Sequence, residues 1–233
     1  MFVRLLPLIT GLLPVLAIHA SLLLAINAES IPSCFPYIDG CVSISAVGRY
    51  EPANFIFKPA MMSEWTILVV YWLFSVAWIR AMAREARAKE KMGTWMGVFG
   101  CAGALALILY VTFLGTQEPF YEFMRRFGVY LYFLFTVVAQ IILARHTITL
   151  SRTMGLSDVT KIGQIQMALA LVPFALGVLT LVLKATLADP DPAENIIEWL
   201  FALLMHIYFV LTYFTWRETC FDGRFRISLR PSE

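Results

Sequence analysis

The stretch that decides the fold is Pro32–Met61, which reads PSCFPYIDGCVSISAVGRYEPANFIFKPAM. It holds four of the eleven prolines, two of the four cysteines and a dense set of polar side chains, whereas the flanking sequence is strongly apolar. A connection of about thirty residues is far longer than most, and ordered loops of this length tend to be functional. We therefore expect a structured cap over a bundle of membrane helices, with most of the polar chemistry in the cap.

The composition is that of a membrane protein. Of the 233 residues, 60% are hydrophobic and only 15% are charged, whereas a soluble domain is about half apolar and a quarter charged. The excess lies in runs long enough to cross a bilayer, which takes about twenty apolar residues. A net charge of +2, without a long basic arm or a Gly-rich phosphate loop, argues against nucleic acid as a partner.

Six apolar runs predict an all-α polytopic protein, a single six-helix transmembrane domain over residues 1–233. The runs are Leu5–Ile26, Trp65–Met82, Thr94–Thr116, Gly128–Ala144, Gly163–Leu187 and Trp199–Trp216. A cleaved signal peptide is the alternative for the first run, but that run exceeds the roughly 7–15 residues of a signal core. The expected outer cap loop covers residues 27–62, and the expected cytoplasmic tail covers residues 217–233.

Most Lys and Arg side chains lie in the second-to-third link, in the fourth-to-fifth link and in the tail, while the other links hold most of the acidic residues. Because cytoplasmic loops carry the excess of Lys and Arg, we expect both termini in the cytoplasm and the cap in the lumen or periplasm. The membrane would be that of the ER or Golgi in a eukaryote, or the inner membrane in a bacterium. The basic cytoplasmic face is a candidate surface for a protein partner.

Ionisable groups within membrane spans are costly and are therefore functional candidates. His19 and His206 are predicted at similar depths in the outer half of the bundle, with Glu64 and Glu198 above them at helix ends. Because a carboxylate can orient an imidazole or raise its basicity, these four residues are the catalytic candidates. The alternative is that each histidine is a neutral core residue and each carboxylate only an interfacial anchor.

The cap supplies candidate ligands for a lipid headgroup. Arg49 and Lys58 could hold a phosphate, because arginine in particular forks onto phosphate oxygens. Ser43, Ser45 and Asp39 are the polar side chains near them in the sequence. The alternative is that the two cations only pair with neighbouring carboxylates.

The cap also holds Cys34 and Cys41, seven residues apart, with Pro36 and Gly40 able to turn the chain between them. A disulfide is favoured there, because the cap is expected on the oxidising side of the membrane. The cap has no histidine and the chain no catalytic metal motif, so we expect no metal and no cofactor.

The cap and the last span resemble a known family. The residues that carry the resemblance are Phe35–Ile38, Ser43–Ala46, Gly48, Glu51–Pro52 and Phe57–Lys58 in the cap, and Glu198–Leu200, His206 and Thr215–Trp216 in the last span. They are similar to the Frag/DRAM/Sfk family of six-helix membrane proteins, and within it to the factors that remodel the lipid of GPI anchors. The resemblance implies a protein that handles acyl chains at the luminal leaflet. The paired cysteines and the exact place of His206 depart from the family pattern.

Two functions follow, and a membrane lipid is the expected partner in both. The first is remodelling of the acyl chains of a phospholipid or glycophospholipid, by an acyltransferase or a lipid hydrolase with His19 or His206 as the general base. The second is a non-catalytic lipid-binding adaptor or regulator, which the absence of a clear nucleophile favours. The family resemblance does not choose between them, because one fold hosts several activities.

The topology can be tested with glycosylation tags. Tags in the cap and in the acidic link next to Glu194 should be modified, and tags near Lys89 should not, because basic links stay in the cytoplasm. Modification near Lys89, read as a mobility shift that a glycosidase removes, would contradict this orientation.

Overall fold

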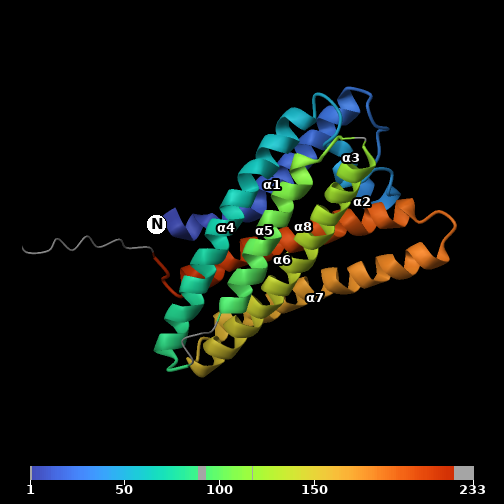
Figure 1. The fold of residues 1–233 in the computed structure, drawn as a ribbon. Helices are drawn as coiled ribbons and strands as arrows, with labels where there is room; N and C mark the ends of the chain where they lie inside the picture. The colour runs from blue at the N-terminus through green and yellow to red at the C-terminus, as the bar shows by residue number, and fades with distance from the viewer. Residues whose placement is uncertain (1, 89–92, 117, 223–233) are drawn as a thin grey trace, which may run out of the picture.

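A computed structural model of the protein describes residues 2–88, 93–116 and 118–222, and its regular elements there are all helices (Figure 1). Six helices are long and apolar enough to cross a membrane: α1 (Phe2–Asn27), α4 (Asn54–Glu85), α5 (Thr94–Thr112), α6 (Pro119–Thr153), α7 (Ser157–Thr186) and α8 (Asp191–Glu218). Two short helices, α2 (Pro36–Asp39) and α3 (Ile44–Val47), lie in the cap. The predicted all-α fold with six candidate spans is confirmed.

Several helices are longer than their apolar runs. The predicted cap loop was too long, because α4 begins at Asn54 and places Lys58 and Glu64 in a helix. α8 likewise begins at Asp191 rather than at Trp199. Only the apolar part of a helix has to match the bilayer: α6 has 35 residues and is about 52 Å long at about 1.5 Å per residue. It therefore extends beyond a membrane of about 40–45 Å, and its polar end turns could not be recognised from hydropathy.

Part of the predicted basic surface lies outside the described residues. This applies to Lys89 and Lys91 of the second-to-third link and to Arg224, Arg226 and Arg230 of the tail.

The six long helices form a closed ring in chain order. Each packs against the next one, and α8 closes the ring against α1. Aromatic side chains fill the interior, where Tyr71 of α4 makes ring contacts with Trp72, Phe209 and Trp216. The Tyr71 and Thr212 hydroxyls lie 3.0 Å apart and join α4 to α8. Close packing and such interhelical hydrogen bonds hold helices together in lipid, where the hydrophobic effect cannot.

The cap is fixed to the first turns of α8, beside which it lies in Figure 1. Asn195 Nδ2 donates a hydrogen bond to the Gly40 carbonyl at 2.7 Å, and Trp199 Nε1 donates to the Val42 carbonyl at 2.9 Å. Gly40 has a positive φ of 61°, and a Cβ there would overlap the backbone of Pro192. A larger residue at position 40 would therefore force the cap away from α8.

Ring closure depends on a close approach at Gly11 of α1, where a Cβ would lie 2.8 Å from the His206 carbonyl oxygen. We expect Gly11→Ala to lower the free energy of unfolding by about 1–3 kcal/mol, because overpacking forces the helices apart. Thermal unfolding in detergent, followed by tryptophan fluorescence, measures the change.

Gly177→Ala is the matched control. Its nearest atom, Phe201 Cε2, is 3.8 Å away, and Ala favours a helix over Gly by about 1 kcal/mol, so this variant should be neutral or stabilised. An equal loss of stability in both variants would contradict the tight α1–α8 contact.

Candidate functional site

An open apolar groove lies between α1 and α8 beneath the cap. Its volume is about 400 Å³, and it is lined by Val15, Leu16, His19, Phe35, Tyr37 and Leu203. Leu16 is 66% exposed and continues a stripe of exposed apolar side chains on α1, the others being Leu5, Ile9, Leu12 and Leu23. In a membrane span such a stripe faces lipid. The groove therefore opens sideways toward the bilayer, at the cap end of the bundle.

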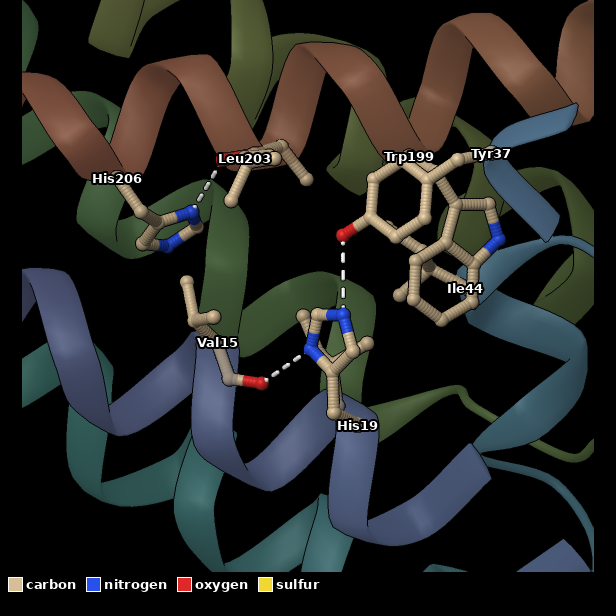
Figure 2. A pocket seen from close by; sticks show the side chains of 9 residues that line it. Val15, His19, Tyr37, Ile44, Trp199, Leu203 and His206 are labelled. Atoms are coloured by element: carbon tan, nitrogen blue, oxygen red, sulfur yellow. Dashed lines mark hydrogen bonds between the residues drawn. The ribbon is translucent and has the colours of Figure 1, made fainter. Parts of the chain in front are cut away.

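A much smaller cavity, of about 10 Å³, is lined by both His19 and His206, with Val15 and Leu203 among its other walls (Figure 2). A cavity needs roughly 10–15 Å³ to hold one water molecule, so this one is at the lower limit for a single water. The structure thus brings together the two histidines that the sequence singled out. Its walls come from α1, α8 and the cap.

His19 is held with one ring nitrogen available as a base. Its Nδ1 lies 2.7 Å from the Val15 carbonyl oxygen and must carry the hydrogen of that bond. In the neutral ring Nε2 is then the acceptor, and the Tyr37 hydroxyl donates to it at 3.0 Å (Figure 2). Burial raises the pKa of Tyr37, so this hydroxyl stays protonated and remains a donor at neutral pH. The result is an imidazole whose Nε2 faces the end of an apolar groove.

The indole ring of Trp199 packs against both His19 and Tyr37. Its ring lies 5.6 Å from that of His19 and 5.3 Å from that of Tyr37, both edge-on. Because its Nε1 is bonded to the Val42 carbonyl, the indole is fixed by the cap as well as by α8. Sequence reasoning did not select Tyr37 or Trp199. Both nevertheless fall within the two segments that carry the family resemblance.

His206 is buried, with 3% of its surface exposed. Its Nδ1 donates to the Ala202 carbonyl at 2.6 Å (Figure 2), and its Nε2 has no hydrogen-bond partner among the described residues. A water in the small cavity is the partner that would satisfy this nitrogen.

The two carboxylates do not orient the histidines, contrary to expectation. Glu64 is fully buried ten residues after the start of α4, with neither carboxylate oxygen bonded to a described residue. Glu198 interacts with the Ser45 backbone N–H and lies near Arg49 and Arg125. Glu198 and His206 are eight residues apart, about 12 Å along a helix, whereas the carbonyl one turn earlier is always in reach. Backbone carbonyls therefore orient both imidazoles.

Most of the predicted headgroup ligands have structural roles. Asp39 accepts a hydrogen bond from the Phe35 N–H at 2.7 Å and closes α2. Ser43 accepts from the Ala46 N–H at 3.1 Å and caps α3, which is the usual role of serine at a helix start. Lys58 was expected in the cap, but it lies on α4 with its Nζ beside Gly115.

Three of the five headgroup candidates do come together. The Ser43 and Ser45 hydroxyl oxygens lie 3.3 Å apart. Arg49 Nη2 donates to Ser45 Oγ at 3.4 Å.

The disulfide between Cys34 and Cys41 is present, as predicted, and Tyr37 lies midway in the loop that it closes. Cys101 and Cys220 are free thiols. In the part of the chain that the structure describes, no group of three or more His, Cys, Asp or Glu side chains is placed to hold a metal ion.

Comparison with known families covers nearly the whole helical region. The Frag1/DRAM/Sfk1/Cwh43P N-terminal domain matches residues 2–218. The chain belongs to this family. The match includes the cap, both histidines and all of α8, so the groove lies within the Frag1/DRAM/Sfk1/Cwh43P domain. No curated protein and no solved structure matches the chain.

The disulfide should hold Tyr37 in place. A loop of this length adds about 2–3 kcal/mol of stability through chain entropy, so Cys34→Ser should lower the unfolding free energy by that amount. It should also speed amide hydrogen exchange in residues 34–41, because the disulfide no longer closes the loop that contains α2. Cys101→Ser, which removes a free thiol from α5, is the control. Equal exchange rates in both variants would show that α8 alone fixes the cap.

Proposed function

We propose that the protein remodels the acyl chains of a phospholipid or glycophospholipid, as an acyltransferase or a lipid hydrolase, at the leaflet on its cap side. The observation that carries this is the His19–Tyr37 pair, 3.0 Å apart, at an apolar groove that opens toward lipid. The distribution of basic residues favours a luminal or periplasmic cap, which would make this the luminal or outer leaflet.

The groove suits an acyl chain. Its lining is almost entirely apolar, and burying hydrocarbon contributes about 0.8 kcal/mol per CH₂ when the chain leaves water. A chain already in the bilayer gains less, so the groove selects by shape and by the polar pair at its end rather than by hydrophobicity. The ester of a chain lying along Leu16 and Val15 would come to rest beside His19.

His19 would act as the general base. An incoming water or lipid hydroxyl takes the place of Tyr37 at Nε2, and its oxygen attacks the ester carbonyl carbon while His19 accepts its proton. The displaced Tyr37 hydroxyl then donates to the carbonyl oxygen as negative charge develops there. When the tetrahedral intermediate collapses, the ester C–O bond breaks and the proton on His19 passes to the departing alkoxide. Water as nucleophile gives hydrolysis, and a lipid hydroxyl gives acyl transfer.

A non-catalytic lipid-binding adaptor is the second candidate, and one observation favours it. The lining of the groove includes no serine, threonine or cysteine side chain, so no covalent acyl intermediate can form there on a residue of those types. A proton-accepting histidine without a nucleophile supports direct transfer, or binding alone. The two candidates differ in whether bound lipid is changed.

The proposal is tested by acyl exchange in vesicles made from total lipid of the native host membrane and supplied with isotope-labelled fatty acyl lipid. Mass spectrometry follows the label. We expect His19→Gln to lower turnover about 100-fold or more, the usual contribution of a general base. Tyr37→Phe should lower it less, because it removes a donor and leaves the base.

His146→Gln is the control, because His146 lies in the later turns of α6, away from the residues that line the groove. Exchange unaffected by His19→Gln would exclude His19 as the base. Bound lipid without exchange in the unaltered protein would establish the adaptor.

A further inference from the structure

At α3, two arginines converge on one hydroxyl. Arg49 Nη2 donates to Ser45 Oγ at 3.4 Å, and Arg125 Nη1 donates to the same oxygen at 3.5 Å. Arg49 comes from the cap and Arg125 from α6, so the cluster joins two segments far apart in the sequence. Both bonds are long for hydrogen bonds to a hydroxyl.

The cluster carries more positive than negative charge. Arg125 shares the Glu122 carboxylate with Arg126, and takes the longer of the two contacts, 3.3 Å against 2.6 Å. Arg49 forms no ion pair within 4 Å with any residue that the structure describes. Glu198 lies nearby and interacts with the Ser45 N–H, which leaves three guanidinium groups facing two carboxylates.

Burying the charged guanidinium of Arg125 costs free energy. Only 7% of its surface is exposed, and the guanidinium of Arg49 is close enough to repel it. A buried charge normally has a good counter-charge and well-made hydrogen bonds. Arg125 instead donates a long hydrogen bond to the neutral Ser45 hydroxyl and shares the Glu122 carboxylate with Arg126.

The depth of the cluster is that of lipid headgroups. Arg125 is the seventh residue of α6, about 9 Å from its start at about 1.5 Å per residue. The apolar run of α6 begins at Gly128, less than one turn after Arg125. Arg125 therefore lies at the edge of the hydrocarbon, next to the polar interface of about 5–8 Å. An anionic lipid group is thus available at the level of this arginine pair.

We propose that Arg49, Arg125 and Ser45 form a binding site for a phosphate group. Two guanidinium groups and a hydroxyl can together donate to a single phosphate, and such charge-assisted bonds are the strong ones. The phosphate relieves the repulsion between the two arginines and completes their hydrogen bonding. Arg126 forms an exposed ion pair with Glu122 and is not part of the site.

This inference deepens the proposed function and rests on it in one respect, that the phosphate belongs to the lipid whose acyl chain enters the groove. Ile44 lines the histidine cavity, and its neighbour Ser45 receives the arginines. One short helix therefore separates the two sites, within the reach of a single phospholipid. A free phosphate-bearing solute from the cap side has the same chemistry, so the test separates these two sources.

The test compares phosphatidylglycerol with diacylglycerol of the same chains, which lacks the phosphate, by native mass spectrometry of the purified full chain. The unaltered protein should bind phosphatidylglycerol more tightly. Arg49→Gln and Arg125→Gln should each lower that affinity about tenfold or more, the usual effect of losing a charged hydrogen bond. Neither change should alter diacylglycerol binding. Arg126→Gln is the matched control and should change neither affinity.

Competition by inorganic phosphate distinguishes the sources: displacement of phosphatidylglycerol at low phosphate assigns the site to a free phosphate-bearing solute, and no displacement assigns it to the lipid. Equal binding of the two lipids, or no loss in Arg49→Gln, overturns the site. Because Arg49 is exposed, its variant folds even if Arg125→Gln does not.

Acyl exchange separates this inference from the proposed function. His19→Gln should keep its preference for phosphatidylglycerol. Phosphate binding without any exchange would support the phosphate site and contradict the enzyme. Exchange that survives both arginine changes would support the enzyme and contradict the claim that the phosphate belongs to its lipid.

Discussion

The hold of α8 on the cap is the interaction on which the rest of the structure depends. Two side chains in the first turns of α8, Asn195 and Trp199, donate hydrogen bonds to cap carbonyls at Gly40 and Val42. These bonds position α2 and α3 over the ring. Tyr37 reaches His19 only because α2 is placed there, and Ser45 meets the arginines only because α3 is. One helix thereby organises two polar sites that share no side chain.

The sequence predicted the number and order of the spans, because a bilayer demands apolar runs that nothing else explains. It failed at helix ends. Lys58 and Glu64 read as cap or boundary residues because they are charged, yet α4 includes both. Where polar residues continue a helix past the hydrocarbon, hydropathy carries no signal, and only tertiary packing decides where the helix begins.

For the candidate site, the depth of each residue in the membrane could be inferred from the sequence, but the direction in which its side chain points could not. Counting residues along two spans brought His19 and His206 to one level, and the structure brings both to one cavity. Which carboxylate faces which histidine depends on helix rotation, and here Glu198 turns toward Ser45 instead. Arg125 was not among the predicted ligands, because its partner Ser45 is eighty residues away in the sequence. Contacts of that separation leave no local pattern.

The contact between α1 and α8 closes the ring with the first and the last spans of the chain. The groove lies at this seam, so neither of its walls is complete until the sixth span has been inserted beside the first. During synthesis His19 enters the membrane early and then waits, without Tyr37 fixed or Trp199 present, while four further spans follow. The order of translation thus delays formation of the groove until the chain is nearly finished, and a partly inserted chain lacks it.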